Sequence, residues 1–573
     1  MIRTAGRKEG SAVVRWARLG ALILTLLAAG RIASTYTAFT TVSDEVAHLA
    51  CGIEWLDRGI YEYESQHPPL ARVFLSLGPY FAGVRNQAHD EMWKEGEALL
   101  YSSSPTKTLT LARLGILPFF LLATAVVWIW SRRLFGEVSA FWAVALFTFL
   151  PPVLAHAGLA TTDMALTACL LFAVYVFSVW LVRRSPARDM LLGLSLGLAV
   201  LAKFSTFVFL PVCVATILGS YWVVRRSSVR ALGEALKARR KPLCLVLVAA
   251  FLVVWAGYRF SLTPFEAREG RPHKSVMRLL HLDGLSQQSR LRQLSYAAIE
   301  TPTPLGALLR GVNLVRRHNE TGHGTWFMGE YRRGSWRMFF PVTLAVKTPL
   351  AFLALYGIGV FAVWKQFRRG RDPSILAPFL CSAATLLAVI PSNINIGVRH
   401  VLPIYGFMAV VAGLAVARSF QAKRLTTSVL ATILLLWLAL SSLRSHPDYL
   451  AYFNELAGDH PERIVIYSDL DWGGQDLLRL PPVLKSLGVT EWSLGLSTRS
   501  HVNPFRHNLP PFHLLIPYQP TKGWVAINLQ ALFFENAARR EEEGRQAGPY
   551  EWLHQYKPVA RAGKTFWIYY IPP

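Results

Sequence analysis

Two neighbouring carboxylates, Asp44 and Glu45, stand shortly after the first apolar run of the chain, and His48 follows one helical turn later. A carboxylate held beside a substrate hydroxyl can act as a general base, and a nearby imidazole can bind a sugar or an acceptor. The same carboxylates could instead only complement the dipole at the start of a helix, with Ser43 as its N-cap. Residue types alone leave both readings open.

A second motif in the same segment reads His67-Pro68-Pro69-Leu70-Ala71-Arg72. Paired prolines favour an extended backbone, which would hold His67 and Arg72 at fixed positions. A guanidinium binds two phosphate oxygens at once, so Arg72 is a candidate phosphate ligand. We expect His67 to contact a sugar or an acceptor.

Four further basic side chains stand at or inside apolar runs, where a charge is costly and is usually paired. We expect them to bind a phosphate: Lys203, Lys347, Arg399 and His400. The alternatives are that Lys203 extends toward the membrane surface and that Arg399 only marks a membrane boundary.

Three other residues are candidates for binding the sugar or the acceptor. Asp163 begins an apolar run and could orient an acceptor, hold a divalent cation or cap a helix. His323 and Glu330 lie in a segment rich in glycine and aromatic residues, which could form a sugar platform or only a tight loop. The Asp- and Gly-rich stretch 467–476 could bind an acceptor or a cation, and a structural turn is an equal alternative. A divalent cation is the only cofactor that these residues suggest.

The elements that must position these residues are membrane helices. Of the 573 residues, 53% are hydrophobic and only 17% are charged, and the mean hydropathy is +0.32. Soluble domains carry about 25% charged residues. We predict eleven spans of about 20 residues. Their approximate bounds are 19–40, 109–131, 138–157, 162–182, 189–204, 205–224, 243–260, 342–364, 374–391, 401–417 and 426–443.

The net charge of +25 would suggest a nucleic-acid partner if the basic residues were spread evenly. With the N-terminus inside, however, 24 of the 60 Lys and Arg residues fall in the six short inner segments, against five of the 35 acidic residues. This is the positive-inside pattern of a multi-pass membrane protein, so no nucleic acid is needed to explain the charge. The first span could alternatively be a cleaved signal peptide.

Three longer segments then lie outside: 41–108, 261–341 and 444–573. In the first, Val46, Leu49, Ala50, Ile53 and Leu56 predict an amphipathic helix on the membrane surface. In the last, strand-length apolar runs predict a small α/β domain outside the membrane. These runs are Arg463–Tyr467, Trp524–Asn528 and Thr565–Ile571, and the charged stretch Arg539–Arg545 predicts a solvated helix.

The patterns Asp44-Glu45-x-x-His48 and His67-Pro68-Pro69-Leu70-x-Arg72 resemble the GT-C superfamily of membrane glycosyltransferases. The resemblance is greatest to the branch of protein O-mannosyltransferases and lipid A aminoarabinose transferases, and it covers residues 1–443. It implies an all-α polytopic membrane protein of about eleven helices, here followed by the α/β domain 444–573.

The resemblance also implies an activity: transfer of a sugar from a polyprenyl-phosphate donor to an acceptor on the outer side of a plasma or bacterial inner membrane. It assigns the base to Asp44, an acidic site residue to Asp163 and the donor phosphate to Arg399. One in-line attack would invert the anomeric centre. The acceptor stays open between a glycan, a lipid and a protein.

Two other functions fit a multi-pass membrane protein with a large outer domain. A transporter or flippase for a lipid-linked saccharide would usually show repeats and polar residues near the midplane. We find no repeat, and the candidate residues gather at one face. A non-catalytic scaffold would not need an acidic pair beside several phosphate-binding side chains.

Overall fold

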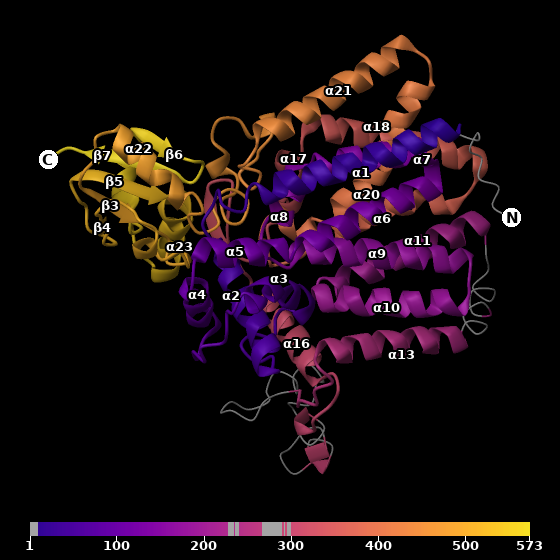
Figure 1. Ribbon diagram of the computed structural model, residues 1–573, viewed down its shortest axis with the longest axis horizontal. Helices are drawn as coiled ribbons and strands as arrows, with labels where there is room; N and C mark the ends of the chain where they lie inside the picture. The colour runs from indigo at the N-terminus through magenta and orange to yellow at the C-terminus, as the bar shows by residue number, and fades with distance from the viewer. Residues whose placement is uncertain (1–9, 227–233, 235–239, 266–288, 291–292, 295–298) are drawn as a thin grey trace.

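The computed structural model describes residues 10–226, 234, 240–265, 289–290, 293–294 and 299–573. Long helices occupy one end of the molecule and a small α/β domain the other, with the shorter helices α2 to α5 between them (Figure 1). Parts of the expected inner segment 225–242 and of the expected outer segment 261–341 lie outside the described residues.

Eight described helical segments are long and apolar enough to cross a membrane, and a ninth, bent pair brings the number to nine. The eight are α1 (Ser11–Ala33), α5 with α6 (Pro105–Leu114 and Leu117–Phe135), α9 (Asp163–Val182), α11 (Thr206–Arg225), α13 (Arg240–Gly257), α18 (Leu350–Gly370), α20 (Ile404–Gln421) and α21 (Leu425–Arg444). The bent pair is α7 (Glu137–Thr148) with α8 (Pro151–Ala157), whose axes meet at 68°. The chain is thus a multi-pass, mainly helical membrane protein, as expected.

The count of eleven spans is not confirmed. The two remaining predicted spans correspond to α10 (Pro186–Ala202), of 17 residues, and to the apolar segment Pro373–Val389, which contains α19 (Ala377–Val389). Both are shorter than the other spans. The predicted span 138–157 is bent because Pro151 and Pro152 begin a new helix after Thr148.

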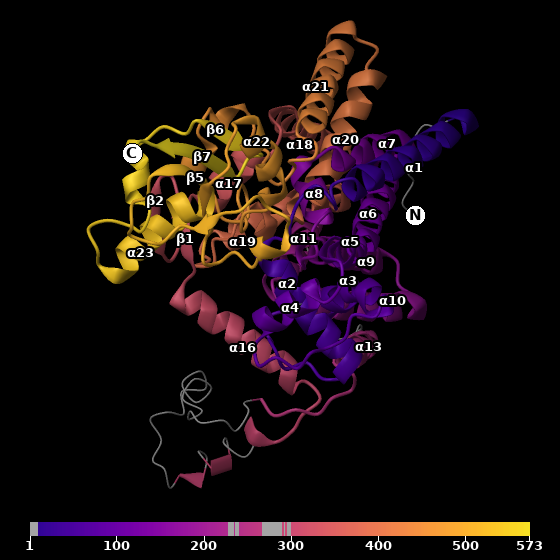
Figure 2. The same cartoon turned by 60° about the vertical axis from the view of Figure 1, so that its left-hand side comes forward.

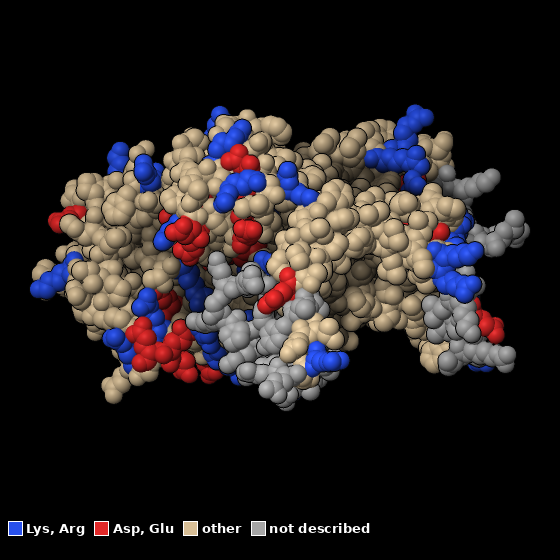
Figure 3. All heavy atoms as spheres, turned by 90° about the horizontal axis from the view of Figure 1, so that it is seen from below, with Lys and Arg blue, Asp and Glu red and all other residues tan. Residues whose placement is uncertain are grey.

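The surface over the long helices carries few charged side chains (Figure 3). On the face shown, Lys and Arg gather at the end of the helices farthest from the C-terminal domain (Figure 3). This distribution agrees with an apolar belt inside the bilayer and a basic inner end.

Three short helices of the first outer segment pack against one another beside the ends of the long helices. They are α2 (Ser43–Ile53), α3 (Pro69–Phe81) and α4 (Met92–Tyr101). The prediction of an amphipathic α2 on the membrane surface is wrong, because ten of its eleven residues are buried. Both its faces are covered: Gly96 of α4 contacts Val46, and Arg72 of α3 approaches Gly52.

The C-terminal domain is built on a five-stranded mixed sheet, with the order β4-β3-β5-β7-β6. The strands are β3 (Trp492–Gly495), β4 (His513–Leu514), β5 (Gly523–Asn528), β6 (Ala560–Ala562) and β7 (Phe566–Ile571). β3 pairs in parallel with β4 and β5, whereas β7 is antiparallel to β5 and β6. The domain also contains α22 (Leu480–Ser486) and α23 (Asn536–Glu543).

Two of the three predicted strands match β5 and β7, and the predicted charged helix matches α23. The prediction of a strand at Arg463–Tyr467 is wrong, because only Tyr467 forms a bridge there, with Asp471. Val465 and Ile466 are apolar because they are buried against the helices and the hairpin, and they pair with no strand.

The remaining helices and a hairpin connect the two ends of the molecule. They are α16 (Gly306–Thr321), the hairpin of β1 (Gly324–Phe327) with β2 (Glu330–Arg333), and α17 (Phe339–Lys347). The hairpin packs against α23 of the C-terminal domain, as Figure 2 shows.

Candidate active site

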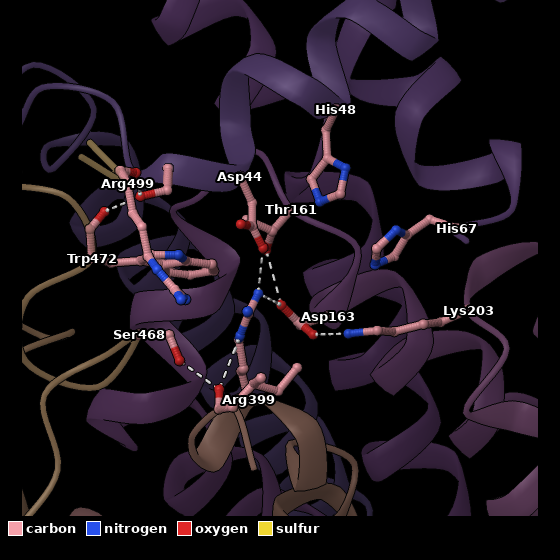
Figure 4. Close-up of polar contacts among 12 residues, drawn as sticks. Asp44, His48, His67, Thr161, Asp163, Lys203, Arg399, Ser468, Trp472 and Arg499 are labelled. Atoms are coloured by element: carbon pink, nitrogen blue, oxygen red, sulfur yellow. Dashed lines mark hydrogen bonds and ion pairs between the residues drawn. The ribbon is translucent and has the colours of Figure 1, made fainter. Parts of the chain in front are cut away.

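Four charged side chains from four separate segments form a cluster beside the junction between the helices and the C-terminal domain (Figure 4). Arg399 Nη1 lies 2.7 Å from Asp44 Oδ2 and 3.8 Å from Asp163 Oδ2. Lys203 Nζ lies 2.5 Å from Asp163 Oδ1. We call these four residues the charged cluster. Asp44 is its most accessible member, with 19% of its side chain exposed, against 6% for Arg399 and 0% for Asp163.

Arg399 lies in a loop that is hydrogen-bonded to the C-terminal domain. Gly397 has φ +92°, and a Cβ there would lie 2.4 Å from Asp469 Oδ2, so this close approach requires glycine. The Asp469 carboxylate accepts the backbone N–H of Val398, and Arg399 Nε donates to Ile396 O at 3.1 Å. The Arg399 guanidinium also stacks on Trp472 at 4.1 Å from the ring centre.

Asp44 is positioned by the same domain. Ser43, one residue earlier, donates its backbone N–H to Trp472 O at 3.0 Å and its hydroxyl to Arg499 O at 2.8 Å. Ser43 is the first residue of α2 and Val42 precedes it as the N-cap, so the expected N-cap is displaced by one residue. Contacts from the C-terminal domain therefore fix the helix end that carries Asp44.

Glu45 is engaged in a different set of contacts. Arg113 of α5 binds both of its oxygens, at 2.8 and 2.9 Å, and both side chains are at most 2% exposed. The backbone N–H groups of Ala160 and Val42 donate to the same carboxylate at 2.8 and 2.9 Å. Glu45 thus ties α2 to α5 and to the loop before α9, and we infer a structural role in place of the catalytic one that the sequence suggested.

Arg72 lies in a buried network within the first outer segment. Its Nη2 forms an ion pair with Glu64, and its Nη1 donates to Tyr61 Oη at 2.9 Å. Its Nε donates to His48 Nδ1 at 3.0 Å. His67 Nδ1 lies 3.1 Å from the Glu64 carboxylate, so one acidic residue holds both the guanidinium and the imidazole. Arg72 is 1% exposed, so it positions the two histidines and is not open to a phosphate.

The hydrogen bonds of this network fix the tautomers of the two histidines. Since Nδ1 of His48 accepts from Arg72, its proton lies on Nε2. Nδ1 of His67 lies 3.1 Å from Glu64 Oε2 and 3.3 Å from Arg72 Nη2. Because the carboxylate is the nearer group and can only accept, we assign the proton to Nδ1, which leaves Nε2 as an acceptor. Burial, and then the charge of Arg72, hold the pKa of His48 well below its usual range, and burial also lowers the pKa of His67. Both rings lie beside the charged cluster (Figure 4) and are neutral at pH 7.

Two of the predicted phosphate ligands lie in other surroundings. Lys347, at the end of α17, donates to Leu450 O at 2.7 Å and to Asp469 O at 2.6 Å, and it lies over the Phe453 ring. It anchors the start of the C-terminal domain. His400 packs between the rings of Phe209 and Phe340. These contacts are structural and do not place either side chain in the charged cluster.

The two candidates from the hairpin segment, His323 and Glu330, lie in different surroundings. His323 is close to the site: its Nδ1 lies 3.2 Å from His318 Nε2, and its ring lies 5.8 Å from that of Tyr467. Burial, and then the charge of Arg499, lower the pKa of His323 to about 3. Glu330 is exposed at the start of β2, and no contact joins it to the charged cluster.

The Asp- and Gly-rich stretch 467–476 forms a structural turn. Asp471 is buried and accepts the backbone N–H groups of Gly474 and Gln530 and the side-chain amide of Asn528. Among the described residues, no group of three or more His, Cys, Asp or Glu side chains is arranged to hold a metal ion. Both oxygens of Asp163 face Lys203, Arg399 or Thr161.

A cavity of about 30 Å³ lies beside the start of α2, lined by Val42, Arg113 and Leu159 among others. It is large enough for one or two waters and contains none of the charged cluster, so we place the site at the cluster and not here.

Sequence reasoning missed several residues that build the site: Glu64, Arg113, Trp472 and Arg499. Trp472 stood within the Asp- and Gly-rich stretch but was not singled out. Glu64 and Arg113 carried no local signal, because their importance comes only from the partner that the fold brings to them.

Comparisons with known proteins bear on the fold and the family. Residues 107–258 match the family described as dolichyl-phosphate-mannose-protein mannosyltransferase, a segment that contains Asp163 and Lys203. No curated protein matches the sequence.

Two kinds of solved structure are similar. A structure of ArnT from Cupriavidus metallidurans bound to undecaprenyl phosphate has 13% identity, a TM-score of 0.49 and coverage of 96% of this chain and 97% of that one. The archaeal oligosaccharyltransferase AglB from Archaeoglobus fulgidus has 14% identity, a TM-score of 0.45 and coverage of 90% and 70%. The family match on residues 107–258 thus covers a part of the chain that supplies two of the four members of the charged cluster, Asp163 and Lys203.

Proposed function

We propose that the protein transfers a sugar from a polyprenyl-phosphate donor to an acceptor on the outer side of the membrane, with Asp44 as the general base. The observation that carries the proposal is the charged cluster, in which the partly exposed carboxylate of Asp44 lies 2.7 Å from the buried Arg399 and Asp163 joins Arg399 to the buried Lys203. The family matched by residues 107–258 is described by a dolichyl-phosphate sugar donor, which supports this class of donor.

The donor phosphate binds at Arg399 and Lys203 in this proposal. Both cations are at most 9% exposed, and a phosphodiester at the membrane surface needs such fixed cations where water is scarce. Their charges are matched by the carboxylates of Asp44 and Asp163. An arriving phosphate therefore competes with Asp44 for Arg399.

This competition connects donor binding to the activation of the base. A carboxylate that loses an ion pair becomes more basic. When Arg399 moves its hydrogen bond to the phosphate, Asp44 is free to accept a proton. Asp44 is thus released to act as the base when the donor is already in place.

The reaction has one displacement step. The acceptor oxygen forms a bond to the anomeric carbon while the bond from that carbon to the phosphate oxygen breaks. The acceptor proton passes to Asp44, and the electron pair of the broken bond stays on the polyprenyl phosphate, where Arg399 and Lys203 stabilise it. A single in-line displacement inverts the anomeric centre.

His48 and His67 bind sugar hydroxyls. Their neutral rings offer a donor, Nε2–H of His48, and an acceptor, Nε2 of His67, whose ring centroids are 5.2 Å apart. Arg72 and Glu64 hold both rings in these tautomers. The structure thus supports a positioning role for Arg72 in place of direct phosphate binding.

The site faces the outside of a plasma or bacterial inner membrane in this proposal. The C-terminal domain contacts Ser43, the residue before Asp44, and the guanidinium of Arg399, so the domain and the charged cluster must lie on the same side of the membrane. The gathering of Lys and Arg at the opposite end of the helices (Figure 3) supports an inner location for that end.

The direct test uses the purified protein in lipid nanodiscs and a panel of polyprenyl-phosphate sugars with labelled sugar, incubated with membrane extract as the acceptor source. We expect one donor to lose its label to an acceptor fraction, with release of one polyprenyl phosphate per transfer. Absence of transfer from every lipid-phosphate sugar, with transfer from a nucleotide sugar, would refute the donor class.

A further inference from the structure

Almost every charge around the candidate active site has a partner of opposite sign. Asp44 and Asp163 face Arg399 and Lys203, Glu64 faces Arg72, and Glu45 faces Arg113. The formal charges of these four carboxylates and four cations sum to zero. An anionic substrate entering a neutral, partly buried site meets no net attraction, so an additional cation is expected.

Arg499 is such a cation. It follows strand β3 in the C-terminal domain, and its side chain runs past Trp472 toward the Asp44–Arg399 pair, on the side opposite to Lys203 (Figure 4). Within the described residues its guanidinium forms no ion pair or hydrogen bond, and it lies over the ring of Phe534 at 4.8 Å. Its backbone carbonyl accepts a hydrogen bond from the Ser43 hydroxyl. This bond holds the backbone of Arg499 beside the residue that precedes Asp44.

Two other groups near Arg499 also point to a ligand. His323 Nε2 is buried and makes no hydrogen bond within the described part of the chain, a costly state for a ring nitrogen. The Tyr467 ring lies 5.9 Å from the ring of Phe534, over which Arg499 lies, and 5.8 Å from the ring of His323. Burial, and then the charge of Asp44, raise the pKa of Tyr467 to about 12, and the charges of Arg399 and Arg499 act in the opposite direction.

We propose that Arg499, with Tyr467 and His323, forms an anion-binding subsite that receives a phosphate or carboxylate group of a substrate from the side of the C-terminal domain. The subsite rests on the proposed function, because it adjoins the charged cluster assigned to transfer. Arg499 and Lys203 approach the charged cluster from opposite sides (Figure 4), so Arg499 adds a third cation to Arg399 and Lys203.

The anion has two sources, the acceptor and the donor, and both share the chemistry that a guanidinium recognises. An anionic acceptor would place its charge on Arg499 and its hydroxyl near Asp44. A donor would instead place its phosphate between Arg399 and Arg499. The C-terminal domain contributes a ligand to the substrate in either case.

The test compares four full-length proteins: wild type, Arg499→Gln, Arg499→Lys and the control Arg506→Gln. Arg506 is exposed on the same domain seven residues later, so its loss changes the net charge equally. The first arm measures binding of undecaprenyl phosphate in nanodiscs. The second arm measures binding of glucose 6-phosphate, glucuronate and uncharged glucose to protein saturated with undecaprenyl phosphate.

An acceptor source predicts that Arg499→Gln weakens binding of the two anionic sugars at least about tenfold and leaves undecaprenyl phosphate binding unchanged. A donor source predicts a loss of at least about tenfold in the first arm. Arg499→Lys should keep part of the affinity in the affected arm. If Arg499→Gln matches Arg506→Gln in both arms, the subsite does not exist.

Failure of the proposed function gives a different result. If the wild type does not bind undecaprenyl phosphate, the proposed donor is wrong. The second arm, repeated without lipid, then still decides the subsite: equal binding of glucose 6-phosphate by wild type and Arg499→Gln overturns it.

Discussion

Replacing Glu45 by Gln should destabilise the protein strongly, although the neighbouring Asp44 is the catalytic residue in our proposal. Glu45 accepts two hydrogen bonds from Arg113 and one each from two backbone N–H groups, all at 2.8–2.9 Å. Glutamine keeps one acceptor oxygen and turns an amide toward the guanidinium. Breaking a buried ion pair by removing one partner costs about 3–5 kcal/mol, because Arg113, 1% exposed, keeps an unmatched charge.

The assay is unfolding of purified protein in detergent, followed by tryptophan fluorescence. Asp44→Asn is the matched control, and its loss should be smaller because Arg399 still faces Asp163 at 3.8 Å. The double variant Glu45→Gln with Arg113→Met should recover part of the stability, since no buried charge is then left alone. A Glu45→Gln protein as stable as the wild type but inactive would refute the reasoning and return Glu45 to the catalytic set.

Three further predictions follow from the site and the charge pattern. Arg399→Ala should weaken undecaprenyl phosphate binding by about 10- to 100-fold in a direct binding assay, and Arg399→Lys should restore only part of it; equal binding by Lys and Arg would leave Arg399 as a boundary marker. Burial opposes ionisation of Glu64, but Arg72 and His67 outweigh it and lower its pKa to about 2, below the ordinary 4.5. Stability from this group is therefore complete above pH 4.5 and is lost as pH falls toward 2, by up to about 3 kcal/mol, a dependence that Glu64→Gln should lack in unfolding measurements. A reporter active only in the cytoplasm, fused after Pro573, should be silent; activity would place the C-terminal domain inside.

The sequence was informative where a local pattern carries the physics. The long apolar runs predicted most of the membrane helices, and two strand-length apolar runs predicted β5 and β7. The Asp44 and Arg399 motifs predicted two residues that the fold brings within 2.7 Å across 355 positions. Both were selected as candidates from their residue types, their places at membrane boundaries and the resemblance to the GT-C superfamily.

The sequence was misleading where the role of a residue depends on a partner that is distant along the chain. Nothing near Glu45 distinguishes it from Asp44, because Arg113 and the Ala160 N–H lie in other elements. Lys347 is an expected phosphate ligand by its charge in an apolar run, yet two backbone carbonyls of the C-terminal domain satisfy it. Which cation meets a carboxylate and which meets a carbonyl is decided by tertiary packing.

The C-terminal domain shows the same limit. Its sequence predicts a separate α/β unit, but the structure makes it part of the site through Trp472, which stacks on Arg399 and accepts the Ser43 N–H. The domain boundary at about residue 444 therefore stays a prediction. Residues on both sides of this boundary contribute to the charged cluster or hold it in place.

The most direct test of the central claim is the Asp44→Asn variant, measured for both turnover and donor binding beside the control Asp459→Asn, an exposed residue of the C-terminal domain. Loss of the base should lower turnover by about 10²–10⁴-fold. Because Asp44 competes with the phosphate for Arg399, undecaprenyl phosphate should bind the variant as tightly as the wild type or more tightly. Near-normal turnover in Asp44→Asn, or a large loss of undecaprenyl phosphate binding without any other change, would contradict the assignment of Asp44 as the base.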